Sequence, residues 1–207
     1  MYNLFYYNVA NMSDELFNSE LNKLPTARQK EIISKETELL KKLSLSGDLL
    51  AKKYLSKFYK IPEEEIIFSK GKYSKPYVLN VNAHYNISHS RTITSIAISD
   101  KPIGICTEHI GDFPIITAHK KFNEDEKKYI NDNLSNAKKQ ISEKAFYELF
   151  SAKKAFIKLY GDTKTDISNS LNFVSVKGKL VPDNKNIELI YDYGIPGTVT
   201  AIVTEKD

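Results

Sequence analysis

The chain has 207 residues, of which 41% are hydrophobic and 27% charged, and its mean hydropathy is -0.40. The apolar content includes 13 Tyr and 10 Phe, enough to offset the entropy lost on folding, so disorder is not expected. No apolar run approaches the roughly 18 residues of a membrane span, and the residues up to Met12 lack the basic region of a signal peptide. A single cysteine, Cys106, excludes internal disulfides and cysteine-based zinc sites. We therefore expect a cytoplasmic protein with no membrane partner.

The formal net charge of +4 lies entirely in residues 1–104, which hold 15 Lys and Arg against 11 Asp and Glu. A basic first half suits an anionic ligand or an acidic protein partner, although solubility alone also explains it. No basic stripe with interleaved aromatic residues matches a nucleic-acid-binding module, so no nucleic-acid partner is expected.

Helical patterns dominate the first 60 residues after Tyr7. Thr26 followed by Gln29 resembles a capping box and predicts a helix that runs to about Leu43. A second helix is predicted to start at Ser46-Gly47-Asp48, with apolar residues at helical spacing as far as Phe58. After Pro62, Ile66-Ile67-Phe68 is typical of a strand.

The remaining elements alternate between strands and helices. Strands are predicted over Ile93–Ser99 and Ile103–Thr107, on either side of a Lys101-Pro102 turn. Helices are predicted over 123–133 and 142–160. The end of the chain is predicted to be β, over 172–176, 187–193 and 198–204, with a turn at Lys177-Gly178.

The two halves of the chain show a weak internal repeat. Helices followed by strands occur in both, and residues 94–99 resemble residues 199–204. This pattern favours an α+β fold made of two similar halves, 1–103 and 104–207. A cleft between such halves is a favoured place for a ligand.

Three segments carry side chains suited to chemistry. Between Lys72 and Ser90 stand several groups that can bind an anion, namely Lys72, Lys75, Ser88, His89 and Ser90. A plain turn between strands explains the same residues. In the strand from Gly104 to His109, Cys106 and Glu108 lie on one face because the strand period is two, so together they can supply two ligands to one ion. The alternative is that Cys106 is a small buried apolar side chain and Glu108 a solvated strand end.

The third segment is the helix that carries Phe146, Leu149, Phe150, Ile157 and Tyr160 at spacings of three and four. Lys153 interrupts this apolar stripe, and Lys154 and Lys158 form an unfavourable like-charge pair. A diphosphate held against the helix would relieve the repulsion between these lysines. A solvated face with one lysine that extends its ammonium to the surface is the alternative.

Taken in order, four motifs resemble the surfactin-synthetase type of 4'-phosphopantetheinyl transferase. They are Tyr73-Ser74-Lys75-Pro76, Asn86-Ile87-Ser88-His89-Ser90, Gly104-Ile105-Cys106-Thr107-Glu108, and the stretch from Phe150 to Lys158. The resemblance spans about residues 20 to 176. It implies two α+β halves related by a pseudo-twofold axis, with coenzyme A in the cleft between them. It also implies transfer of phosphopantetheine from coenzyme A to a serine of an acyl or peptidyl carrier protein, with Mg²⁺.

The resemblance also implies roles for single residues. Lys75, Ser88, His89 and Lys158 would hold the phosphates of the coenzyme, and Lys41 or Lys42 would help with its nucleotide end. Glu126 would deprotonate the carrier serine and, with Lys158, would form the catalytic pair. The segment around Phe122 would touch the carrier protein. We expect the protein to act as a monomer.

Two positions depart from the family pattern. The family holds its metal with the Asp and Glu of Gly-Ile-Asp-x-Glu and with a Glu in the last motif, where this chain has Cys106, Glu108 and Lys154. An ammonium about 4 Å from a divalent ion is repelled by roughly 2 kcal/mol even at the dielectric constant of water. Lys154 is therefore expected to neutralise the diphosphate itself, in place of Mg²⁺.

Two further alternatives remain open. A softer metal held by Cys106, Glu108 and His109 is one, although strand alternation points His109 to the other face. The other concerns function: the chain is either an enzyme that primes carrier proteins with an altered metal requirement, or a non-catalytic relative that binds coenzyme A, a carrier protein, or both.

Overall fold

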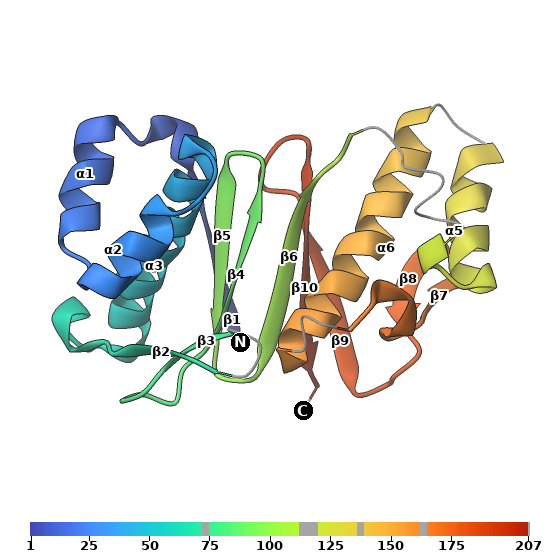
Figure 1. Cartoon of the computed structure of the whole chain (residues 1–207). Helices are drawn as coiled ribbons and strands as arrows, with labels where there is room; N and C mark the ends of the chain where they lie inside the picture. The colour runs from blue at the N-terminus through green and yellow to red at the C-terminus, as the bar shows by residue number, and fades with distance from the viewer. Residues whose placement is uncertain (72–74, 112–119, 136–138, 162–164, 207) are drawn as a thin grey trace.

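The computed structural model describes residues 1–71, 75–111, 120–135, 139–161 and 165–206 (Figure 1). The strands are β1 (Tyr2–Asn8), β2 (Phe68–Lys70), β3 (Pro76–Val78), β4 (His84–Ser90), β5 (Ile93–Ser99), β6 (Ile103–His109), β7 (Phe173–Val176), β8 (Lys179–Pro182), β9 (Ile187–Asp192) and β10 (Thr198–Glu205). The α-helices are α1 (Asp14–Asn22), α2 (Thr26–Ile33), α3 (Glu38–Tyr59), α5 (Glu124–Ser135) and α6 (Lys139–Tyr160). The expected α+β class is confirmed.

Two three-stranded antiparallel sheets lie face to face, with helices on the outer side of each (Figure 1). The first sheet has the order β1-β5-β4 and is covered by α1, α2 and α3, whereas the second has the order β6-β10-β9 and is covered by α5 and α6. Alternation along β5 sends Ile96 and Ile98 toward α3 and Ala97 toward the second sheet. Ala97 packs there with Ile105 and Ile202, so an apolar layer joins the sheets.

Both sheets are built in the same chain order. The first strand of each half pairs antiparallel with the last, so Tyr2 stands opposite Ser99 and Thr198 opposite His109. The similar segments 94–99 and 199–204 lie in β5 and β10, which are the central strands of the two sheets. β6 begins at Ile103, beside the predicted boundary between the halves. The pseudo-twofold axis stays a prediction.

The predicted helix start at Ser46 is wrong, because α3 runs unbroken from Glu38 to Tyr59. Its N-cap is Thr37, whose side chain accepts the N–H of Leu40. Ser46 and Gly47 are buried within α3 and serve its packing. The Ser46 hydroxyl bonds Thr94 Oγ1 at 2.6 Å, and a Cβ at Gly47 would lie 3.4 Å from His89 Nε2. Ser46 and Gly47, although typical of a helix start, lie in the middle of α3, where their small size allows the helix to approach the sheet.

Other local predictions also differ from the structure. Thr26 is the first residue of α2 rather than its cap; Pro25 precedes it and makes no side-chain cap bond. Gln29 donates from Nε2 to Leu24 O at 2.7 Å instead of closing a capping box. β1 and β8 were not predicted, and Ile66 and Ile67 precede β2. The strands β5, β6 and β10 and the helices α5 and α6 lie where the sequence predicts strands and helices, whereas the segment read as a turn forms the strand β4.

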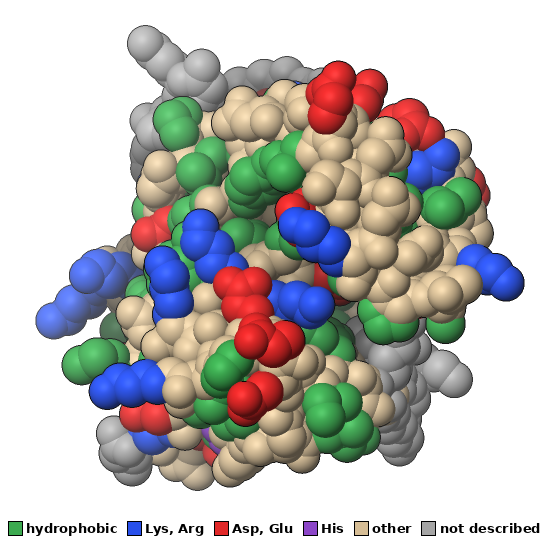
Figure 2. All heavy atoms as spheres, turned by 90° about the vertical axis from the view of Figure 1, so that its left-hand side faces the viewer, with side chains coloured by type: hydrophobic (Ala, Val, Ile, Leu, Met, Phe, Trp, Pro, Cys, Tyr) green, Lys and Arg blue, Asp and Glu red, His purple; other side chains and the backbone are tan. Residues whose placement is uncertain are grey.

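The outer surface over α1, α2 and α3 carries basic and acidic side chains close together rather than a patch of one sign (Figure 2). Lys42 pairs with Asp14 and Arg28 with Asp48 in this region, each at 2.8 Å. Both basic side chains named here are therefore paired with carboxylates. No helix in the described part of the chain is both long and apolar enough to cross a lipid bilayer.

Candidate functional site

Side chains of β4 join the two sheets. At every second residue a side-chain oxygen of β4 accepts a backbone N–H of β6: Asn86 Oδ1 from Ile105, Ser88 Oγ from Thr107 and Ser90 Oγ from His109, at 3.1, 3.0 and 2.9 Å. β6 is an edge strand of its sheet, and these bonds satisfy amides that would otherwise stay open. The Ser88 oxygen that was expected to bind a phosphate is thus buried and engaged with Thr107.

A chain of hydroxyl groups runs through the same interface. Ser95 Oγ and Thr107 Oγ1 lie 2.6 Å apart, and Thr107 Oγ1 lies 2.8 Å from Thr200 Oγ1. Tyr6 donates to Asp192 Oδ1 at 2.6 Å, and its hydroxyl oxygen lies 3.0 Å from Thr200 Oγ1. Buried polar groups need such partners, so this row helps to set how the two halves meet. This row and the roles of Asn86 and Ser90 were not predicted, because residues 86–90 were read as a turn and not as a strand; the polar residues at 86, 88 and 90 have the period-two spacing that could have indicated one.

Helix α6 lies unusually close to β6. A Cβ at Gly104 would lie 2.1 Å from Ala155 O and 2.5 Å from Leu159 N, so only glycine fits there. This approach places the lysines of α6 beside the strands that link the halves. The glycine of the Gly104-Ile105 motif therefore has a packing role that sequence reasoning did not identify.

Glu108 of β6 lies at the centre of a small polar cluster. Lys154 Nζ lies 2.6 Å from Glu108 Oε1, and the Cys106 thiol donates to the same oxygen at 3.3 Å. The prediction that Cys106 and Glu108 share a face is confirmed, and Cys106 is also buried in the core as the alternative expected. The Lys154 ammonium, expected to be available for a diphosphate, is paired with Glu108 instead.

Two more lysines lie near the C-terminal end of α6: Lys158 belongs to that helix, and Lys75 directly precedes β3. Lys158 donates from Nζ to Ile87 O of β4 at 2.5 Å, and Lys75 donates to Lys158 O and Leu159 O at 3.0 and 2.8 Å. Burial lowers the pKa of Lys158 to about 8, and the charges of Lys154 and Lys75 add to the effect. Lys75 thus comes close to Lys154 and Lys158, which lie one turn apart on α6. We call these three residues the lysine cluster.

A cavity of about 310 Å³ adjoins this cluster. Lys75 and Gly161 line it on the side of α6, and Tyr77, Tyr85 and Tyr160 supply aromatic walls. Its size is at the lower end of the range of small-molecule sites, which is roughly 300–1,000 Å³.

His89 and Lys42 lie on the α3 side of β4. His89 Nε2 faces Gly47, and desolvation together with the charge of Lys158 lowers the pKa of the imidazole. Lys42 donates to Met12 O and to Asp14 Oδ1, both at 2.8 Å, so its ammonium is turned toward the start of α1. Lys41 pairs with Glu38 on the same helix. The charge of Lys158 thus reaches His89, whereas Lys41 and Lys42 are paired with groups outside the lysine cluster.

Glu126 and Lys153 form a buried ion pair at 2.8 Å, with exposed fractions of 0% and 1%. Glu126 also accepts the N–H groups of Phe173 and Asn123 at 3.1 and 3.0 Å. The partner of the buried lysine is therefore this carboxylate and not a ligand, and the carboxylate expected to deprotonate a carrier serine has no exposed surface.

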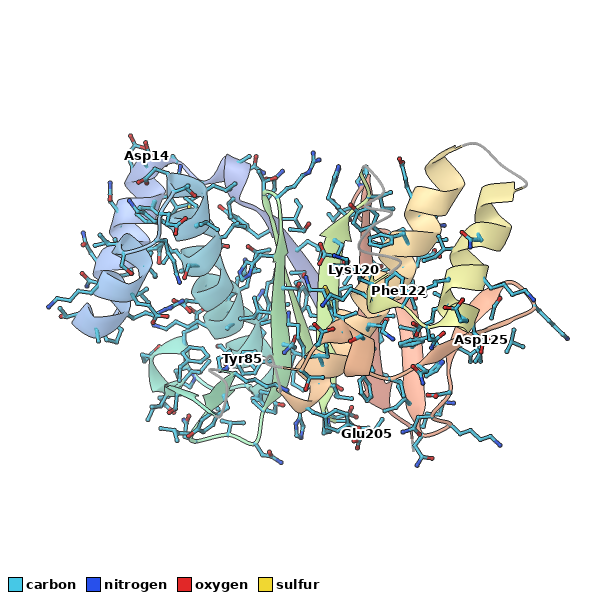
Figure 3. The ribbon with its side chains drawn as sticks, turned by 45° about the vertical axis from the view of Figure 1, so that its right-hand side comes forward. Asp14, Tyr85, Lys120, Phe122, Asp125 and Glu205 are labelled. Atoms are coloured by element: carbon cyan, nitrogen blue, oxygen red, sulfur yellow. The ribbon has the colours of Figure 1, made fainter. Side chains whose placement is uncertain are left out.

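Phe122 is buried and does not form a surface for a partner protein. Phe122, labelled in Figure 3, lies just before α5. Its ring centroid lies 5.5 Å from that of Phe146 in α6. Lys120, two residues earlier, is exposed. Lys72, the Tyr73-Ser74 part of the first motif and residues 112–119 lie outside the described residues.

The donor set does not fit the Mg²⁺ that the resemblance implies. Mg²⁺ takes oxygen ligands, but burial and then the Glu108 charge raise the pKa of the Cys106 thiol to about 12, and Lys154 brings a positive charge to Glu108. Across the described ranges no group of three or more His, Cys, Asp or Glu is placed to hold a metal ion. His109 makes no third ligand with Cys106 and Glu108, so a softer metal finds no site there either.

Comparison with known proteins relates the chain to one family. A family model described as the N-terminal part of 4'-phosphopantetheinyl transferase matches residues 11–101. The 4'-phosphopantetheinyl transferase psf-1 of Bacillus pumilus is 35% identical over 169 residues, which are 79% of this chain and 71% of that protein. The transferase gsp of Aneurinibacillus migulanus is 40% identical over 118 residues, 57% of this chain and 48% of that protein. Sfp of Bacillus subtilis (strain 168) is 34% identical over 119 residues, 57% and 51% of the two chains. The match thus spans about half the length of gsp and of Sfp.

Proposed function

The chain belongs to the 4'-phosphopantetheinyl transferase family, and from this premise we propose that it transfers phosphopantetheine from coenzyme A to a serine of an acyl or peptidyl carrier protein. In this reaction the serine Oγ forms a bond to the phosphorus that carries the pantetheine arm. The P–O bond to the second phosphate breaks, and the nucleotide bisphosphate leaves with the electron pair. The serine proton passes to a base.

The lysine cluster is the observation that carries this proposal. Lys75, Lys154 and Lys158 bring three ammonium groups to the junction of β4, β6 and α6, with one carboxylate, Glu108, among them. Lysine binds phosphate as a point charge, and positive charge placed where the leaving phosphate gains negative charge lowers the barrier of phosphoryl transfer. Each ammonium exchanges a backbone or carboxylate oxygen for a phosphate oxygen when the coenzyme binds.

The other proposed site residues fit this role less directly. Ser88, His89 and Lys42 would need to leave their present contacts to reach the coenzyme. Glu126 would need to leave Lys153 to accept the serine proton. Its three partners support a positioning role instead, in which Glu126 holds the start of α5 and the strand β7 against α6.

Intact mass spectrometry tests the activity. An apo carrier protein, incubated with this protein, coenzyme A and either Mg²⁺ or EDTA, should gain the mass of one phosphopantetheine. The same carrier with its acceptor serine changed to alanine should gain nothing. The Lys158→Ala variant should be much slower, and Lys179→Ala, which removes an exposed lysine of β8, should match the parent. If several carriers stay unmodified while coenzyme A still binds, the chain is a non-catalytic relative.

A further inference from the structure

We propose that the Glu108–Lys154 ion pair and Lys158 form a metal-free diphosphate site, so that coenzyme A binds this protein without a divalent cation. The inference rests on the proposed function, because coenzyme A is its ligand. It goes beyond that function by naming which charges of this chain neutralise the diphosphate.

The first argument is the position of Lys154. Its ammonium lies 2.6 Å from Glu108 Oε1. A divalent cation bound to the same carboxylate would lie close to this ammonium and would be repelled by it. The neighbouring thiol of Cys106 is a neutral hydrogen-bond donor to that oxygen rather than an anionic ligand. The polar groups around Glu108 are thus donors, and donors complement an anion.

The second argument is the balance of charge. The lysine cluster carries three positive charges and Glu108 one negative charge, so their sum is two positive charges. The diphosphate of coenzyme A, esterified at both ends, carries two negative charges at neutral pH. The cluster therefore neutralises the ligand with no metal ion, whereas an added Mg²⁺ would leave the site with excess positive charge.

The third argument is access. The Lys154 side chain is 39% exposed and Glu108 is 18% exposed, so a ligand can reach the ammonium from solvent. When Lys154 turns toward a phosphate, Glu108 still accepts the Cys106 thiol. The carboxylate is then not left without a partner, which keeps the cost of the rearrangement low.

Calorimetry with the whole chain tests the proposal. Coenzyme A should bind in EDTA and in Mg²⁺ with dissociation constants equal within about threefold, and Mg²⁺ alone should give no binding heat. Binding that is more than about tenfold tighter in Mg²⁺ would overturn the metal-free site while leaving the proposed function intact. No binding of coenzyme A in either buffer would overturn both.

Matched variants locate the site. Lys154→Gln should weaken coenzyme A binding in EDTA about tenfold or more, because a charge-assisted bond is lost. Lys144→Gln serves as the control, since Lys144 lies on the same helix and also pairs with a carboxylate, that of Glu148. Equal affinities of the two variants would contradict the proposal.

A double variant restores the acidic residues that the family pattern has at positions 106 and 154. Cys106→Asp with Lys154→Glu restores two oxygen ligands beside Glu108, and coenzyme A binding should then require Mg²⁺. A folded double variant, checked by circular dichroism, that binds coenzyme A equally in EDTA and Mg²⁺ would contradict the role of Lys154. If the double variant does not fold, the comparison of Lys154→Gln with Lys144→Gln decides the question.

Discussion

Ser88 Oγ accepts the N–H of Thr107 at 3.0 Å and so fastens β4 of the first sheet to β6 of the second. The serine is buried, and Thr107 is one residue before Glu108. The bond therefore holds in place the strand that carries the carboxylate of the candidate site.

Ser88→Ala should lower the free energy of unfolding by about 1–3 kcal/mol, because the buried Thr107 amide would lose its acceptor. Urea denaturation measures this change. Ser175→Ala, at an exposed position of β7, should alter stability by no more than about 0.5 kcal/mol. A Ser88→Ala protein of parental stability but weakened coenzyme A binding would instead favour a role as a phosphate ligand.

Gly104→Ala should destabilise the protein by about 3 kcal/mol or more, because the added methyl meets the backbone of α6 at Ala155 and Leu159. Thermal unfolding followed by circular dichroism gives the size of the effect. Gly111→Ala is the matched control just beyond the end of β6, where a Cβ would meet its nearest atom at 3.6 Å. Similar melting temperatures for both variants would show that α6 can shift away from β6.

Removing one member of the buried Glu126–Lys153 pair should cost about 3–5 kcal/mol, because the other charge is left buried without its partner. Glu126→Gln and Lys153→Met are the single variants. The double variant Glu126→Leu with Lys153→Met should regain much of the loss. If Glu126→Gln keeps full stability but loses transfer activity, Glu126 acts as the base that the family resemblance implies.

The pKa of Lys158, lowered to about 8, makes stability depend on pH. In the unfolded chain this lysine keeps its proton up to about pH 10.5, so between pH 8 and 10.5 the unfolded state binds more protons than the folded state. The contribution of Lys158 to the free energy of unfolding should therefore rise with pH across this window. Urea denaturation of the parent and of Lys158→Met at several pH values isolates it.

Coenzyme A affinity should change in the opposite direction. Above about pH 8 the Lys158 ammonium loses its charge, so the dissociation constant of coenzyme A should increase. Lys158→Met should bind more weakly and lose this pH dependence. An affinity that is constant from pH 7 to 9.5 in the parent would show that Lys158 does not contact the coenzyme.

Cys106 should resist thiol reagents while the protein is folded. Burial raises the pKa of its thiol to about 12, and only the thiolate is reactive. A disulfide reagent at pH 8 should label one thiol per chain in guanidinium chloride and almost none in its absence. Rapid labelling of the folded protein would show that β6 opens near the candidate site.

The sequence pattern predicted helices and strands correctly where neighbouring residues in the chain determine the local structure. The alternation along β5, β6 and β10 and the apolar stripe of α6 are properties of single segments, and each predicted an element that the structure contains. The same alternation correctly placed Cys106 and Glu108 on one face. Ser46 and Gly47 were misread as a helix start because the contacts that require small residues there, with Thr94 of β5 and with His89 of β4, lie outside their own helix.

The partners of the polar side chains were decided by the tertiary structure. Lys154 meets Glu108 across 46 residues, Lys153 meets Glu126 across 27, and Ser88 meets Thr107 across 19. The sequence by itself determined that lysines gather on α6 and that acids are missing from two family positions. Only the packing of α6 on β6 and α5 decided that Lys154 pairs with Glu108 and that Lys153 is buried with Glu126, because a charge pairs with what lies near it in space and not with what lies near it in the chain.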